Sequence, residues 1–208
     1  FDPTDDSIYE GNETAGISVS SVSGGGASES GTQAVTITIT DNETTAPTVT
    51  LATSATSIAE NAGSSLTLTA TLSVATTADV TVELSTSGTA IEGTDYTDGS
   101  GNIDDIVISA GSTTGTVNFT PTDDSIYDAT SNETATIAIS GVSGGSASES
   151  GTQSVTITIT DNESAPTVSL SSSASTIDEN GGGSITITAT ASVATLSLIH
   201  ISEPTRPQ

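Results

Sequence analysis

The segment Leu66-Thr67-Leu68-Thr69-Ala70-Thr71-Leu72 places an apolar side chain at every second position. Successive side chains of a β-strand point to opposite faces of a sheet, so this alternation predicts a strand with one buried face. Threonine is also a good strand former. The same pattern returns along the chain, most clearly in residues 80–84, 117–119, 137–139 and 155–159.

Clusters of Gly, Ser, Asn and Asp separate these runs, and no segment has a convincing helical period. We therefore predict seven strands, near residues 48–51, 64–73, 79–86, 103–109, 113–121, 132–140 and 153–160. Seven short antiparallel strands in a unit of this length predict an all-β fold, an immunoglobulin-like antiparallel β-sandwich.

The chain repeats itself with a period of about 119 residues. Residues 1–9 return at 119–127, 35–43 return unchanged at 155–163, and 46–49 return at 165–168. This spacing predicts the C-terminal part of one copy in residues 1–43, a complete copy in 46–163 and the start of a third in 166–195. The Ala-Pro pair before the second and third copies is interpreted as a short, stiff linker.

Acidic residues follow alternate strands of the complete copy. If every connection reverses the chain, the ends of strands one, three, five and seven lie at one pole of the sandwich. That pole then collects carboxylates from four separate loops: Glu60, Asp95, Asp123, Asp124, Asp128, Asp161 and Glu163. Clustered carboxylates repel one another unless a cation or protons compensate them.

Oxygen ligands in this number favour Ca²⁺, which accepts six to eight of them in flexible geometry. The pattern recurs in the incomplete copies at Asp5, Asp6, Glu10, Asp41, Glu43 and Glu179. Acids also gather in loops simply because loops are solvated and Asp is a turn former. We adopt that interpretation for Glu83, Glu92, Asp98, Asp104 and Asp105.

Several of these motifs together resemble the Calx-beta domain. They are residues 58–61, 88–90 and 93–96, the Asp123-Asp124 pair, Asn132-Glu133 and the terminal 159–163. The family is known from the regulatory region of sodium/calcium exchangers and from bacterial surface and secreted proteins. The resemblance implies calcium ligands at the seven acids of the complete copy, with the Ile126 carbonyl as a backbone ligand. Asp161-Asn162-Glu163 stands where calcium-tight members have three aspartates, which implies fewer or weaker ions.

The composition argues against other classes of function. The 208 residues carry 26 acidic side chains against a single basic one, for a net charge of −25. No patch can therefore neutralise the phosphates of nucleic acid or of an anionic membrane, so we expect neither as a partner of this segment. There is no cysteine, the single histidine is His200, and aromatic residues are 2% of the chain. We therefore expect no enzymatic activity and no catalytic residues.

Residues 196–208 depart from the repeat and resemble a translated sequencing adapter, so we expect this tail, with His200 and Arg206, to be artefactual. We expect the rest to be a piece of a large bacterial cell-surface or secreted protein. In it, calcium-rigidified repeats would serve as spacers or adhesive segments that contact neighbouring repeats, while other modules bind surface glycans or proteins. Two alternatives remain open: a calcium-sensing regulatory domain of a membrane protein such as an exchanger, and a metal-free immunoglobulin-like spacer.

Overall fold

The fold of the complete copy is two five-stranded sheets packed face to face. The structure is a computed structural model and describes residues 1–127, 132–180 and 183–195. One sheet has the order β10-β8-β13-β15-β5, formed by Ile106–Ile108, Val80–Gly88, Asn132–Ser143, Ser154–Thr160 and Ser57–Ala59. The other has the order β14-β4-β6-β11-β9, formed by Ser148–Glu149, Thr48–Thr53, Leu66–Leu72, Thr114–Pro121 and Tyr96–Thr97.

All seven predicted strands are present, and the predicted immunoglobulin-like β-sandwich is confirmed. Most pairs are antiparallel, as in β6 with β11 and β13 with β15. The short strands β5, β9 and β14 were not predicted, because two or three residues are too few to show an alternation. Across the described residues, no helix is long and apolar enough to cross a membrane.

The alternating apolar residues form the core between the two sheets. Leu66, Leu68, Ala70 and Leu72 of β6 are all buried, while the threonines between them are partly or fully exposed. They face the fully buried Ile137 and the other inward side chains of β13, β8 and β15. Two aromatic rings extend the core, because Tyr96 stacks on Phe119 with ring centroids 4.6 Å apart. The periodicity of the sequence therefore assigned the core side chains correctly.

The incomplete copies form paired strands without a core of this kind. In the first copy β2 (Glu13–Ser18) pairs with β3 (Ala34–Ile39), and in the third β16 (Val168–Ser172) pairs with β17 (Ile187–Ala191). Leu170 is 66% exposed, whereas its counterpart Leu51 in the complete copy is 7% exposed. Each incomplete copy lacks the strands that would cover such side chains.

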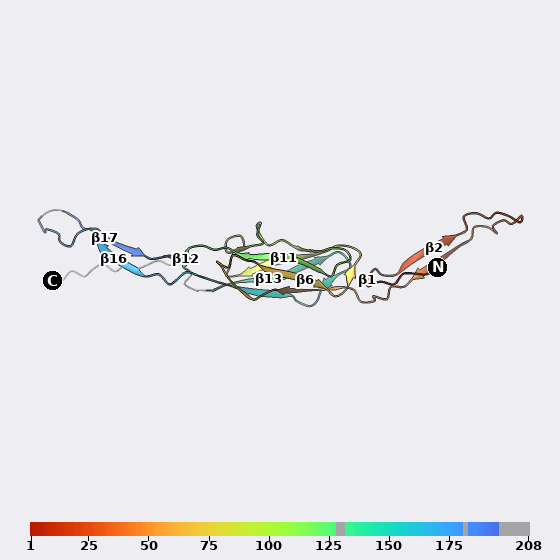
Figure 1. Ribbon diagram of the computed structural model, residues 1–208, viewed down its shortest axis with the longest axis horizontal. Coiled ribbons are helices and arrows are strands. Elements are labelled where there is room, and N and C mark those ends of the chain that lie inside the picture. The colour runs from red at the N-terminus through yellow and green to blue at the C-terminus, as the bar shows by residue number, and fades with distance from the viewer. Residues whose placement is uncertain (128–131, 181–182, 196–208) are drawn as a thin grey trace.

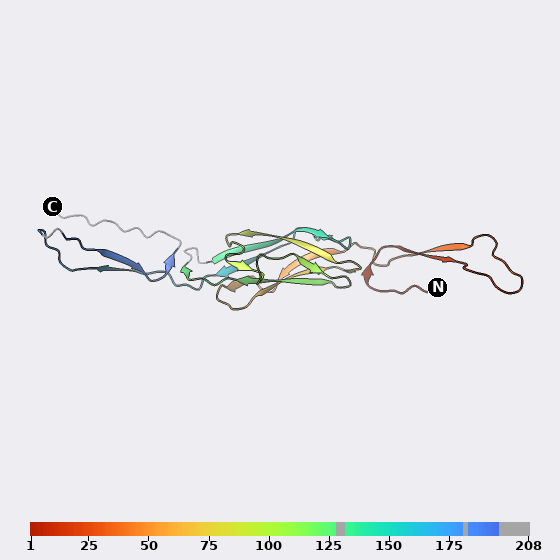
Figure 2. The ribbon, with the colours of Figure 1, turned by 90° about the horizontal axis from the view of Figure 1, so that it is seen from above.

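Two more strand pairs join successive copies. β1 (Ile8–Tyr9) of the first copy pairs in parallel with β7 (Ala75–Thr76) of the second. β12 (Ile126–Tyr127) of the second pairs in parallel with β18 (Ala194–Thr195) of the third. The three copies follow one another in an extended arrangement, with the complete copy in the middle (Figures 1 and 2). The tail 196–208 lies outside the described residues.

We expect Ile137→Ala to lower the free energy of unfolding of the chain by about 2–5 kcal/mol, because it opens a cavity in a close-packed core. Ile137 is 0% exposed, whereas its counterpart Ile17 in the first copy is 44% exposed. The matched variant Ile17→Ala should therefore change the free energy by only about 0.5 kcal/mol. Urea unfolding followed by circular dichroism measures both, and equal losses would contradict a core confined to the complete copy.

Candidate metal centre

Glu60 meets the end of the last strand because the chain changes sheets after β4. After β4 the chain crosses to the other sheet, where β5 pairs in parallel with β15 and Ile58 lies opposite Ile159. The Glu60 N–H continues this ladder and donates to the Thr160 carbonyl at 3.1 Å. The Asn162 N–H in turn donates to Glu60 Oε1 at 3.1 Å. Strands β5 and β15 therefore hold Glu60 beside the terminal Asp-Asn-Glu segment.

Three carboxylates converge at this position. Glu60, Asp161 and Glu163 each offer an oxygen within 4.8 Å of the other two, and all three side chains are half-buried. Among the described residues, one group of at least three acidic or histidine side chains is arranged so that it could share a metal ion, and it is this one. The topological prediction that acids from the first and last loops meet at one pole is realised in these three residues.

The terminal segment holds its own carboxylates in place. The Glu163 N–H donates to Asp161 Oδ1 at 2.8 Å, and Asn162 Nδ2 donates to Glu163 Oε1 at 2.9 Å. The other oxygen, Glu163 Oε2, is buried and has no hydrogen-bond partner, and it is the one such side-chain atom among the described residues. An anionic oxygen removed from water without a partner is unfavourable, so this atom is suited to a cation or a proton.

The electrostatics of Glu60 agree with that conclusion. Burial is the main cause that raises the pKa of its carboxyl group from 4.5 to about 7. The hydrogen bond from Asn162 lowers the pKa, and the neighbouring Glu163 and Asp161 carboxyls raise it. Without a cation, the cluster therefore reduces its repulsion by keeping a proton near neutral pH.

Of the other predicted ligands that the structure describes in the complete copy, Asp123 shares a cavity with this group. Asp123 and Glu60 line one cavity of about 190 Å³. The loop of Asp95 contacts the same region, since the Thr122 N–H donates to the Asp95 carbonyl at 2.9 Å. The Asp95 carboxylate itself accepts the Ile91 N–H at 2.6 Å, and Asp124 Oδ1 accepts the Ile126 N–H at 2.6 Å.

Two further predictions for this pole have different outcomes. Ile126 lies in β12 and is half-buried, so its backbone is placed between two copies of the repeat. Asp128 falls outside the described residues. The ligand roles of these residues, and those of Glu60, Asp95, Asp123, Asp124, Asp161 and Glu163, stay predictions.

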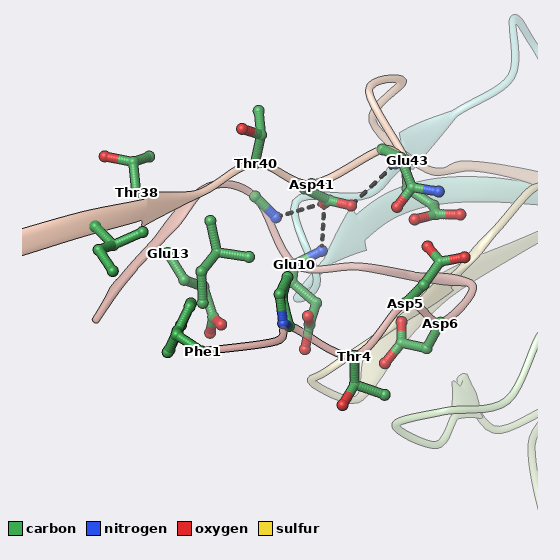
Figure 3. Close-up of a pocket in the computed structure, with 15 residues that line it drawn as sticks. Phe1, Thr4, Asp5, Asp6, Glu10, Glu13, Thr38, Thr40, Asp41 and Glu43 are labelled. Carbon is green, nitrogen blue, oxygen red and sulfur yellow. Dashed lines mark hydrogen bonds between the residues drawn. The ribbon is translucent and has the colours of Figure 1, made fainter.

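The first copy shows the C-terminal half of the same pole. Asp5, Asp6, Glu10, Asp41 and Glu43 line a pocket of about 430 Å³. Figure 3 shows Asp5 pointing towards Glu43, with the Asp41 carboxylate between the two chain segments. Asp41 Oδ2 accepts the N–H groups of Glu10 and Gly11 at 2.9 and 2.7 Å, and Oδ1 accepts that of Glu43 at 2.9 Å.

The pKa values in this pocket move in opposite directions. Backbone hydrogen bonds, first that of Glu10, hold the pKa of Asp41 below its ordinary value. Loss of solvation raises the pKa of Glu10 and of Glu43, and neighbouring acids such as Asp6 and Asp41 add to the rise. Asp41 therefore stays ionised and anchors the loop, while the two glutamates carry the repulsion that a cation could relieve.

The third copy contributes little to a site. Glu179, the counterpart of Glu60, is exposed and does not belong to the group of three carboxylates. The residues that would face it follow the last strand of a repeat, as Asp161 and Glu163 do in the complete copy. A single N-terminal half therefore cannot assemble the pole.

Sequence reasoning missed two contributors. Asn162 links Glu60 to Glu163 through its backbone and side chain, and Glu13 lines the pocket of the first copy. Both lie in motifs that recur in the repeat, and that recurrence was the signal available. Glu92 also differs from the expected solvated residue, because it is half-buried and accepts hydrogen bonds from the Ile103 N–H and the Thr86 hydroxyl at 2.6 and 2.9 Å. Asp98 is a half-buried turn residue whose carboxylate accepts the N–H groups of Ser100 and Gly101 at 2.7 and 2.9 Å, so it too differs from a fully solvated residue.

Comparison with known proteins finds one matching family and several similar solved structures. The family model of the Calx-beta domain matches residues 3–43 and 42–163. The crystal structure of CBD12 from CALX1.2 is 19% identical, with 54% of this chain and 44% of that chain covered and a TM-score of 0.43. A two-domain protein of unknown function from Bacteroides fragilis is 11% identical, with 62% and 55% covered and a TM-score of 0.38.

The chain spans about half the length of these two solved structures. A search of the curated proteins found no match.

We expect the metal-free protein to gain stability from Glu60 as the pH falls. The pKa of Glu60 is raised from 4.5 in the unfolded chain to about 7 in the folded one. Its contribution is therefore fully present below about 4.5 and is lost as the pH rises through about 7. In chelator, wild type should therefore become more stable relative to Glu60→Gln as the pH falls from about 7 to about 4.5. Urea unfolding at several pH values measures this difference.

The control for this pH series is Glu83→Gln, which removes one charge from an exposed position on β8. Its difference from wild type should stay nearly constant over the same window. A pH-independent difference for Glu60→Gln as well would show that Glu60 ionises normally.

Proposed function

This chain belongs to the Calx-beta domain family, and from that membership we propose that its repeats bind calcium at the acidic pole. The residues proposed to hold the ion in the complete copy are Glu60, Asp161 and Glu163, with Asp123 on the adjoining cavity. The observation that carries the proposal is Glu163 Oε2, a buried carboxylate oxygen with no hydrogen-bond partner beside two other carboxylates.

The chemistry of the donors supports calcium over other metals. Every candidate donor is an oxygen atom, and the chain contains no cysteine. Calcium accepts carboxylates and carbonyls in irregular geometry, whereas magnesium demands a tight octahedron and keeps its waters. When bound, calcium would offset the mutual repulsion of the three carboxylates. Asp123 lines a cavity with Glu60, and the neighbouring Thr122 N–H donates to the Asp95 carbonyl, so we propose that these two loops add further ligands.

The proposed role of this ion is structural. Asp161 and Glu163 directly precede the linker to the next copy, so a cation there would join the first and last strands of one repeat close to the junction. A ligand present at a hundred times its Kd stabilises the folded state by about 2.7 kcal/mol. That is a large share of the stability of a small domain.

We further propose that the repeats are non-catalytic spacers of a larger extracellular or cell-surface protein. Three sequence features support this role: a tandem array, Thr- and Ser-rich strands, and a charge of −25 that keeps such arrays apart from one another. The partners of this segment would be calcium and the neighbouring repeats. Any adhesive target would bind to other modules of the parent protein.

Thermal unfolding of the whole chain tests the calcium site. The midpoint in millimolar calcium should exceed that in chelator by roughly 10 °C, given about 2.7 kcal/mol of linkage. Glu163→Gln should remove most of this difference, because it replaces the unpaired anionic oxygen in the cluster. Circular dichroism follows the transition, and magnesium should give a smaller shift.

Two further variants sharpen the result. Glu83→Gln removes the same charge from β8 and should keep the full calcium effect. Asp124→Asn keeps an oxygen that can accept the Ile126 N–H but lowers the charge, so loss of the shift there would add Asp124 to the ligands. Identical melts of wild type in calcium and in chelator would instead indicate a metal-free spacer.

A further inference from the structure

The contact between successive copies occurs twice in the structure, with the same residues in the same register. Ile8 lies opposite Ala75 and Tyr9 opposite Thr76 at the first junction. At the second junction, Ile126 lies opposite Ala194 and Tyr127 opposite Thr195. In each case an Ile-Tyr dipeptide of one repeat adds, as a short parallel strand, to an Ala-Thr dipeptide of the next.

A hydrogen bond within its own loop holds the start of the Ile-Tyr dipeptide at both junctions. Asp6 Oδ1 accepts the Ile8 N–H at 2.9 Å, and Asp124 Oδ1 accepts the Ile126 N–H at 2.6 Å. This aspartate turn is the same in the incomplete first copy and in the complete one. The dipeptide therefore needs only its own loop to take up the extended form, and its side chains are half-buried at both junctions.

The Ala-Thr dipeptide is likewise held by contacts within its own repeat. The turn before it is tied to the first strand of its repeat, because the Ser73 N–H donates to the Thr48 carbonyl at 2.9 Å. In the third copy the Ser192 N–H donates to the Thr167 carbonyl at the same distance, although most of that copy is missing. The first two strands of a repeat are thus enough to build this segment.

Packing in the complete copy holds the segment firmly. Thr76 is 1% exposed, its hydroxyl donates to the Ala78 carbonyl at 2.7 Å, and its carbonyl accepts the Gly111 N–H at 2.8 Å. Gly145, with φ of +53°, lies against the Thr76 side chain so closely that a Cβ there would be 2.8 Å from it. The edge presented to the preceding repeat is therefore rigid.

We propose that the Ala-Thr strand of each repeat is a docking site for the Ile-Tyr strand of the repeat before it. When a strand adds to the exposed edge of a sheet, backbone hydrogen bonds supply most of the binding affinity and side chains contribute little. Two residues would bind weakly between separate molecules. Here the short linker, residues 44–47 at the first junction, makes the contact intramolecular and raises the effective concentration into the millimolar range or above.

The consequence is a second attachment between repeats. The linker joins them covalently and the strand pair joins them again, so one repeat cannot rotate freely on the next. Figures 1 and 2 show β1 and β12 at opposite ends of the complete copy, so the device can propagate along an array. The inference rests on the proposed function only in taking the repeats to act in series, because the paired residues are uncharged and need no ion.

Disulfide trapping tests the docking, because the chain has no cysteine. Paired strands lie about 4.8 Å apart, within the Cα separation that a disulfide accepts. The test variants are Ile8→Cys with Ala75→Cys, and Ile126→Cys with Ala194→Cys. Equilibration with glutathione, read by mass spectrometry, gives the effective concentration of each thiol pair.

The controls move one cysteine to the start of the last strand of the preceding repeat: Ala34→Cys with Ala75→Cys, and Ser154→Cys with Ala194→Cys. These pairs enclose fewer residues, so a flexible chain would close them more readily than the test pairs. We expect the test pairs to exceed the controls by at least tenfold. Equal values would overturn the docking.

Calcium separates this proposal from the proposed function. The excess of the test pairs should appear in chelator as well as in calcium, and an excess seen only in calcium would overturn ion-independent docking. A chain whose melting is insensitive to calcium but whose test pairs still exceed the controls would refute the calcium site alone. If the buried Ala75 position does not tolerate cysteine, the Ile126 and Ala194 pair decides the result.

Discussion

The parallel pairing of β5 with β15 is the interaction on which the rest of the complete copy depends. It takes the chain from the sheet of β4 to the sheet of β15, forms one edge of that sheet and joins the two ends of the repeat. Because Glu60 follows β5 directly and Asp161 follows β15, the same pairing assembles the acidic cluster. The edge of the sandwich and the acidic cluster therefore depend on the same strand pair. An interaction that stabilises the cluster also stabilises the sandwich.

The incomplete copies show what happens without that closure. Ile187 of the third copy is 62% exposed, while its counterpart Leu68 is fully buried in the complete copy. Local turns nevertheless survive in both settings. The Glu43 and Glu163 N–H groups donate to Asp41 and Asp161 in the same way, and Gln33 and Gln153 both donate to a serine carbonyl three residues earlier. Turns are thus local properties of this sequence, whereas burial requires both halves of a repeat.

Charge is the second theme of the molecule. Its single arginine lies outside the described residues, so the carboxylates of the described part rely on N–H and O–H donors, protons or cations. Asp41 and Asp98 are satisfied by backbone N–H groups, which lower their pKa. Glu60 accepts one backbone N–H, from Asn162, yet burial still raises its pKa, and Glu163 Oε2 is buried without a hydrogen-bond partner. Glu60 and Glu163 are therefore the acids of this cluster whose charge the surrounding protein compensates least.

The sequence by itself determined the strands, the core side chains, the repeat and the family, because alternation, turn chemistry and self-similarity are all readable within a few residues. It also predicted an acidic pole, of which the structure brings three members together, Glu60, Asp161 and Glu163. Only the tertiary structure decided that Glu60, Asp161 and Glu163 form the inner group, and that Ile-Tyr pairs with Ala-Thr across each junction. Those contacts join residues far apart in the chain, such as Glu60 and Asn162 at a separation of 102. Short strands of two or three residues carry no periodic pattern, so their partners are chosen by the packing of the whole sandwich.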